Sequence, residues 1–254
     1  MRKLFSAFLL AVFLCAPSSA KTPLRSADQF RADLEPSLLR LDRTIALSVD
    51  TPDLSAVASC LERLMFESIL KGYSCQLTGG VLTVSPVYCD WYRVLRGAQD
   101  SLAASRLSRQ DIQTLSAARR AVSAARKNGA KDHLTLVKSF HDDLVRASRY
   151  SANPSRGDAH SVLVEKEGTC DGYAAAFQLL CRLVGVESLI IRGKTGGRHS
   201  WNMVRVDGQW RHIDVTWDDP LPDTPCRVVY DYFMLTDSQI SKDHSWEGDY
   251  PAAR

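Results

Sequence analysis

Apolar residues recur at helical spacing in four segments of the chain. These segments are residues 53–69, 108–127, 132–145 and 170–184. Asp53, Ser108 and Asp132 begin the first three, and short polar side chains of this kind are common helix N-caps. Glycines follow the second and fourth segments, where helices readily end. Each segment is therefore predicted to be an amphipathic helix.

Other segments have the alternation or the short apolar runs of strands. Tyr73–Thr78 and Val81–Ser85 flank Gly79-Gly80 and predict a small hairpin. Further strands are expected at 189–191 and 228–235, on either side of two longer alternating segments. We expect an accessory region at 21–130, mostly helical with this hairpin, and a second domain at 131–254.

The two alternating segments meet at Asp207-Gly208, a favoured pair for a two-residue hairpin turn. With this pair at the tip, residue 206 faces 209, 203 faces 212 and 201 faces 214. His199, Trp201, Asp214 and Thr216 then share one face of the sheet. His199 and Asp214 become diagonal neighbours with backbones about 7–8 Å apart, a gap that their side chains can close with one hydrogen bond.

Residues 1–20 have the three parts of a secretory signal peptide. A basic start is followed by the apolar stretch Leu4–Ala16 and by the small residues Ser18-Ser19-Ala20. A membrane anchor or a buried first helix is the alternative, but the stretch is shorter than the roughly 20 residues of a spanning helix. We expect a secreted protein, periplasmic or extracellular, cleaved near Ala20 and with no later membrane span.

Composition and charge exclude little but do not favour a polyanionic partner. Hydrophobic residues make up 45% of the chain and charged residues 24%, as in ordinary globular proteins. Cleavage would remove Arg2 and Lys3 and lower the formal net charge from +3 to +1. Nothing in this balance suggests nucleic acid. The arginines and Lys127 of segment 108–127 are expected to form a solvated helix face.

Six cysteines would remain after cleavage, at positions 60, 75, 89, 170, 181 and 226. None has C-x-x-C spacing, which argues against a zinc site. If Cys170 stays a thiol, at most two disulfides can form. The closeness of Cys60, Cys75 and Cys89 in the sequence suggests one bridge among them, and the pairing of Cys181 and Cys226 stays open.

Two of these cysteines lie in one predicted helix but in different surroundings. Cys170 is at its start, where unpaired N–H groups and the helix dipole favour a thiolate. Gly168 and Gly172 allow a tight turn and close backbone approach there. Cys181 lies among leucines and is expected to be core or half of a disulfide. A cysteine at a helix start is more often structural than catalytic, so the hypothesis of a nucleophile needs a base.

The hairpin can supply that base. Cys170, His199 and Asp214 would form a nucleophile, a general base and a carboxylate that orients the base. The backbone N–H of Cys170 could donate to an oxyanion, and a second donor is not identified. The competing interpretation is a core cysteine near an edge histidine.

Three motifs in this order resemble the signature blocks of transglutaminase-like proteins. They are Gly168-Thr-Cys-Asp-Gly-Tyr173, His199-Ser-Trp-Asn202 and His212-Ile-Asp-Val-Thr-Trp-Asp-Asp-Pro220. Phe140–Val145 with Tyr150, Thr236-Asp237 and His244-Ser-Trp246 are similar to bacterial secreted members. The resemblance covers about residues 131–250, and Thr169 departs from it where many relatives carry Val.

The resemblance implies an α+β, papain-like fold in which helices pack on an antiparallel sheet. It also implies a Cys170 nucleophile, a His199 base and an Asp214 orienter, acting on a protein or peptide substrate through a thioester. Members include cross-linkers, peptidases, deamidases and inactive proteins. We expect hydrolysis first and cross-linking second, with a catalytically silent peptide- or cell-surface-binding module as the alternative of another class. No cofactor is expected.

Several neighbouring residues are expected to support the site or bind substrate, namely Trp201, His212, Gly172 and Tyr173. Trp201 is expected to shield the His199–Asp214 hydrogen bond from water, and His212 to have a supporting or packing role. His141 is expected to be structural, and His244 a packing or rim contact. Asp218-Asp219 resembles a pair of calcium ligands, but no oxygen-rich loop accompanies it, so a loop start is the better interpretation.

Overall fold

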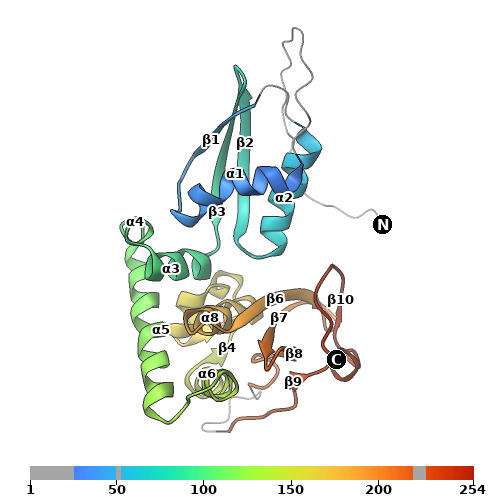
Figure 1. Ribbon diagram of the computed structural model, residues 1–254. Coiled ribbons are helices and arrows are strands. Elements are labelled where there is room, and N and C mark those ends of the chain that lie inside the picture. Colours follow the sequence, from blue (N-terminus) through green and yellow to red (C-terminus); the bar gives the residue numbers. More distant parts are fainter. Residues whose placement is uncertain (1–25, 50–52, 220–226) are drawn as a thin grey trace. The chain divides into compact units, whose positions relative to one another are not determined.

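A computed structural model describes residues 26–49, 53–219 and 227–254 of the chain. The chain divides into two compact units, one ending at Tyr88 and the other beginning at Cys89 (Figure 1). The expected signal peptide lies outside the described residues, as do Pro220 and Cys226. Among the described residues, no helix has both the length and the apolar character needed to cross a membrane.

The first unit combines two helices with a three-stranded antiparallel sheet. The helices are α1 (Ala27–Leu39) and α2 (Leu54–Phe66), and the strands are β1 (Ile45–Ser48), β2 (Leu70–Thr78) and β3 (Val81–Tyr88), in the order β1-β3-β2. Asp53 caps α2 as expected, because its carboxylate accepts from the N–H groups of Ser55 and Ala56. The hairpin is longer than the pattern indicated, and β1 adds a third strand to it.

The second unit is α+β, as expected. Its helices are α3 (Asp90–Gln99), α4 (Ser101–Ala104), α5 (Arg109–Lys127), α6 (His133–Ala147), α7 (Ala159–Leu163), α8 (Cys170–Leu183), α9 (Asp237–Ile240) and the short 3₁₀ helix η1 (Pro154–Arg156). A five-stranded antiparallel sheet has the order β10-β6-β7-β8-β9. Its strands are β6 (Glu187–Lys194), β7 (Arg198–Val206), β8 (Gln209–Ile213), β9 (Phe233–Leu235) and β10 (Ser245–Trp246), and a separate parallel pair joins β4 (Arg149–Tyr150) to β5 (Glu167–Gly168).

Helix α8 is the centre of this unit. It packs against β6 and β7 of the sheet and against α3, α6 and α7 (Figure 1). Every residue from Gly172 to Cys181 is buried. A Cβ on Gly172 would lie 2.6 Å from the carbonyl oxygen of Arg156, so only glycine lets the first turn of α8 approach that backbone so closely. The buried helix thereby fixes the position of its own N-terminus.

The division between the units differs from the boundary expected at 130/131. Residues 89–130 belong with the second unit, because α3 and α5 pack on α7 and α8. Small buried residues on α5, Ala117, Ala118 and Ala125, allow this close packing. The carboxylate of Asp90 accepts from the N–H of Ala159 at 2.7 Å and ties α3 to the start of α7. The accessory region is therefore shorter than the sequence suggested.

The hairpin β7–β8 has the register that the Asp207-Gly208 turn predicts. Val206 pairs with Gln209, and the ladder continues to Asn202 opposite Ile213. Both turn residues have positive φ, 51° for Asp207 and 77° for Gly208, which suits a type I′ turn. The last strand is shorter than expected, since β9 covers only 233–235 of the predicted 228–235.

The disulfide expected among Cys60, Cys75 and Cys89 is wrong. Cys60 and Cys75 are free thiols, so no two of the three can be bridged. Cys60 is buried in α2, and burial raises the pKa of its thiol. Burial also raises the pKa of Cys75 to about 11. Closeness in sequence therefore did not bring these side chains together, because they project from different elements.

Candidate active site

Cys170 is the first residue of α8, and its side chain is half-buried. Its N-cap residue, Thr169, makes no side-chain hydrogen bond to the first turn. The first N–H groups of a helix have no partner within the helix. The partial positive charge of the helix start is therefore not neutralised by a capping side chain next to Cys170.

The start of β7 is tied to this turn of α8. One carboxylate oxygen of Asp171 accepts from the Ser200 hydroxyl at 2.6 Å, and the other accepts from the guanidinium of Arg198 at 3.1 Å. These two residues flank His199 in the sequence. Asp171 thus holds His199 beside the start of the helix that carries Cys170.

His199 and Asp214 form a buried hydrogen-bonded pair. The Nε2 atom of His199 lies 2.6 Å from Oδ2 of Asp214, and the Asp214 side chain is fully buried. The other carboxylate oxygen accepts from the backbone N–H groups of Thr216 at 3.0 Å and Trp217 at 3.2 Å. The backbone that follows β8 therefore orients the Asp214 carboxylate, and this carboxylate in turn orients the His199 ring.

The electrostatics favour a charged imidazole. Burial disfavours imidazolium at His199, but hydrogen bonds to Asp214 and Cys170 outweigh it and raise the pKa of His199 to about 9. Burial alone would raise the pKa of Asp214, whereas hydrogen bonds from His199 and His244 lower it. Because Nε2 is engaged by Asp214, Nδ1 is the ring nitrogen left to serve Cys170.

Aromatic rings enclose the pair. Trp201 stacks on His199 with a centroid distance of 5.9 Å and an angle of 19°, and its indole is almost fully buried. Trp217 lies 6.0 Å from His199 on centroids and remains 38% exposed. Trp201 therefore covers one face of the His199 ring, whereas the Trp217 indole is partly exposed to solvent.

Known proteins share this part of the chain. Residues 120–215 match the sequence model of the transglutaminase-like superfamily. This region is transglutaminase-like. It contains Cys170, His199 and Asp214, in the order in which the three sequence motifs present them.

Individual relatives match different shares of the chain. Kyphoscoliosis peptidase of Homo sapiens is 34% identical over 101 residues, which is 33% of this chain and 15% of that protein. The Mus musculus protein of the same name is 30% identical over 101 residues, with the same shares. A crystal structure of a TGase superposes with a TM-score of 0.39 and 13% identity, covering 68% of this chain and 50% of that one. The chain thus spans only a small part of the curated relatives.

Two supporting residues of the transglutaminase-like region are fully buried. The hydroxyl of Tyr173 donates to Asp219, which anchors α8 to the segment after β8. Nδ1 of His212 accepts from the indole N–H of Trp201 at 3.0 Å, and Nε2 faces Asp237 at 2.8 Å. Burial foremost lowers the pKa of His212. Both side chains thus hydrogen-bond to other side chains of this unit.

His244 is the site residue that sequence reasoning missed. It is buried, and its Nε2 lies 3.0 Å from the same Asp214 oxygen that His199 uses. The hairpin register could not predict this contact, because His244 lies beyond the hairpin and beyond the family match, which ends at residue 215. The motif His244-Ser-Trp246 was the one available signal.

The buried residue His141 belongs to a separate cluster. Nδ1 of His141 lies 3.1 Å from Asp142, and Nε2 lies 3.0 Å from Asp218. Asp218 also accepts from the N–H of Tyr232. Asp218 and Asp219 thus both accept hydrogen bonds from side chains or backbone of the same unit, which fits the loop start expected from the sequence.

Among the described residues, one group has the ligand types and spacing for a metal ion, formed by His199, Asp214 and His244. Their candidate ligand atoms lie within 4.8 Å of one another. Nε2 of His199 and Nε2 of His244 both hydrogen-bond to Asp214 Oδ2. A cation would have to displace both protons, so the donor set is better explained by the hydrogen bonds.

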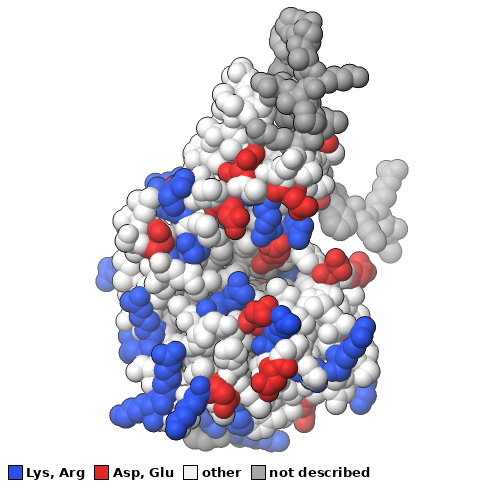
Figure 2. Space-filling view, viewed as in Figure 1, with Lys and Arg blue, Asp and Glu red and all other residues white. Residues whose placement is uncertain are grey.

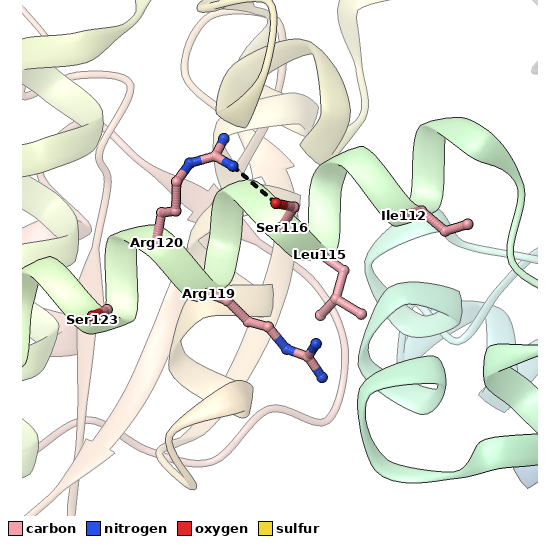
Figure 3. Close-up of a pocket in the computed structure, with 6 residues that line it drawn as sticks. All are labelled: Ile112, Leu115, Ser116, Arg119, Arg120 and Ser123. Carbon is pink, nitrogen blue, oxygen red and sulfur yellow. Dashed lines mark hydrogen bonds between the residues drawn. The ribbon is translucent and has the colours of Figure 1, made fainter.

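A surface hollow lies on α5, lined by Ile112, Leu115, Ser116, Arg119, Arg120 and Ser123 (Figure 3). Arg120 donates to Ser116 at 2.9 Å, whereas Arg119 extends to the other side of the helix. Basic side chains gather over this helix on the face shown in Figure 2. Arg119 and Arg120 are both exposed, in line with the solvated face expected from the sequence.

Proposed function

We propose that this chain is a secreted, cysteine-dependent acyl-transfer enzyme that hydrolyses peptide or side-chain amide bonds. The observation that carries the proposal is the placement of His199. One nitrogen is fixed by Asp214 at 2.6 Å, and the other is left to interact with Cys170. A histidine held in this way can keep a thiolate and its own proton as an ion pair.

In the first step the Cys170 thiolate attacks the carbonyl carbon of the amide. The tetrahedral intermediate collapses when the C–N bond breaks, and Nδ1–H of His199 gives its proton to the departing amine. Cys170 is left as a thioester. In the second step Nδ1 takes a proton from water, the hydroxide attacks the thioester, and the carboxylic acid product and the thiolate are released.

Two donors are suited to the oxyanion. The N–H of Cys170 lies at the uncapped start of α8. Tyr150 lies on β4, where it pairs with Gly168 of β5. It also interacts electrostatically with Cys170. Burial foremost, and then the charge of Cys170, raises the pKa of Tyr150. Its phenol therefore keeps its hydrogen and can serve as the second donor.

The test of the nucleophile is alkylation by iodoacetamide, followed residue by residue by mass spectrometry. At neutral pH we expect Cys170 to react at least about 100-fold faster than Cys181, because burial raises the pKa of Cys181. The variant His199→Ala should remove most of this advantage, whereas His133→Gln, which changes an exposed histidine, should not. An inert Cys170 would favour the silent binding module instead.

Hydrolysis and cross-linking differ in the second nucleophile. Incubation with dimethylated casein and a fluorescent primary amine separates them. Release of ammonia or of new N-termini without incorporation of the amine supports hydrolysis, and covalent incorporation supports a cross-linker. The kyphoscoliosis relatives are named as peptidases, which supports hydrolysis as the first choice.

A further inference from the structure

The carboxylate of Asp214 binds two imidazoles, not one. Oδ2 accepts from His199 at 2.6 Å and from His244 at 3.0 Å, and the side chains of Asp214 and His244 are completely buried. Since Oδ1 is occupied by two backbone N–H groups, the carboxylate makes four hydrogen bonds. His244 therefore competes directly with His199 for the negative charge of Asp214.

Both ring nitrogens of His244 face carboxylates. Its Nε2 faces Asp214, and its Nδ1 lies 2.6 Å from Oδ1 of Asp243. The His244 ring is thus held between two carboxylates, one fully buried and one partly exposed.

The hydrogen-bond chain continues outward. The second oxygen of Asp243 accepts from the hydroxyl of Tyr232 at 2.7 Å, and the Asp243 side chain is 40% exposed. Trp201 and Trp217 meet the edge of the His244 ring at centroid distances of 5.0 and 4.7 Å. His244 thus links the buried carboxylate to a partly exposed one and supports the aromatic enclosure.

We propose that His244 is a positioning residue that holds Asp214 in place and limits how strongly this carboxylate retains the proton of His199. The inference deepens the proposed function and rests on it. A general acid must release its proton to the leaving amine, so the carboxylate behind it should not hold that proton too firmly. A second hydrogen-bonding group on the same oxygen draws part of the negative charge away from His199.

The charged and titratable groups around the two rings set the expected sign. They are Asp214, Asp243, Tyr232, His212 and Cys170. The His244 ring lies 5.7 Å from that of His199, and both rings hydrogen-bond to the same Asp214 oxygen. Removing the His244 imidazole should therefore leave more of the Asp214 charge to His199 and let His199 keep its proton to higher pH.

The probe is the ratio of the alkylation rates of Cys170 with iodoacetate and with iodoacetamide, measured against pH. The imidazolium of His199 attracts the carboxylate of iodoacetate, so the ratio falls when His199 loses its proton. In His244→Gln we expect the midpoint of this fall to move up by about one pH unit. Asp243→Asn removes one carboxylate partner of His244 and should shift the midpoint the same way by less.

His133→Gln is the matched control and should leave the midpoint unchanged. An unchanged midpoint in His244→Gln, in protein with wild-type near-UV circular dichroism, overturns the inference. If His244→Gln does not fold, Asp243→Asn decides alone, because its side chain is partly exposed. If the wild type shows no fall in the ratio at all, the proposed function itself fails.

Discussion

His141 and His199 are two of the buried imidazoles of the second unit that meet carboxylates, and they differ in what the second ring nitrogen faces. His141 has a carboxylate at both nitrogens, Asp142 at 3.1 Å and Asp218 at 3.0 Å. His199 has a carboxylate at one nitrogen and interacts with Cys170 through the other. The first ring has no atom left for chemistry and is suited to hold elements together. A single open nitrogen is what makes the other a candidate general acid and base.

The energetics of the two clusters are otherwise similar. Burial disfavours the charged ring at His141, but its two carboxylate hydrogen bonds outweigh burial and raise its pKa. The same competition, with Asp214 and Cys170 as partners, raises the pKa of His199 to about 9. A raised histidine pKa alone therefore does not distinguish a reactive site from a structural one.

Replacing His199 by alanine should have the largest effect on the rate of hydrolysis. We expect His199→Ala to lower amide hydrolysis by at least about 10⁴-fold, because nucleophile and base act as a unit. His141→Ala should retain its rate per folded molecule. Steady-state rates, corrected for the active fraction by titration of Cys170, provide the measurement. Equal losses in both variants would contradict the difference between the clusters.

Removing the negative charge of Asp214 should have the next largest effect on the rate of hydrolysis. Asp214→Asn should lower the rate by about 10³–10⁴-fold, since the ring loses its orientation and correct tautomer. It also removes the main cause that raises the pKa of His199, so the alkaline fall of the iodoacetate/iodoacetamide ratio should move from about pH 9 to lower pH. A midpoint that stays in place would show that Asp214 does not control His199.

Tyr150→Phe should lower turnover by a smaller factor than the two preceding variants. Loss of one oxyanion donor costs about 10²-fold or more in turnover. The variant removes only a hydroxyl, so kcat should fall while the alkylation rate of Cys170 stays near that of the wild type. A fall in both would assign Tyr150 to the state of the thiol rather than to the oxyanion.

The cluster of His141, Asp142 and Asp218 should contribute to the stability of the protein and not to its catalytic rate. His141→Gln should lower the free energy of unfolding by about 3–5 kcal/mol, because it breaks a buried ion pair. The folded pKa of His141 is above its unfolded value of about 6.5. Its stabilisation is therefore complete below that pH and is lost as pH rises through the raised value. Urea unfolding of wild type and variant should converge at alkaline pH, and a constant gap would contradict this.

Local signals in the sequence predicted much of the candidate site. The Asp207-Gly208 turn sets the hairpin register through its positive φ angles, and that register brings His199 to Asp214. Asp132 and Ser108 begin helices because their side chains cap the first turn. These signals act over a few residues and can be read directly.

Other features depend on contacts between distant segments. Helix α3 begins after Cys89, which makes no side-chain cap, so nothing marked its start. Strand β9 is shorter than the apolar run because Tyr230 instead stacks on His141 and hydrogen-bonds to Asp142. His244 reaches Asp214 from 30 residues away. No periodicity encodes such a contact.

The half-exposed indole of Trp217 has a practical consequence. It lies against both His199 and His244, at 6.0 and 4.7 Å on centroids. A protonated imidazole in contact with an indole quenches its fluorescence, and a molecule that covers the ring shifts its emission. The difference between wild-type and Trp217→Phe spectra isolates this one of the chain's five tryptophans. The protein thus carries an intrinsic optical reporter beside its candidate general base, which allows ligand screening without any label.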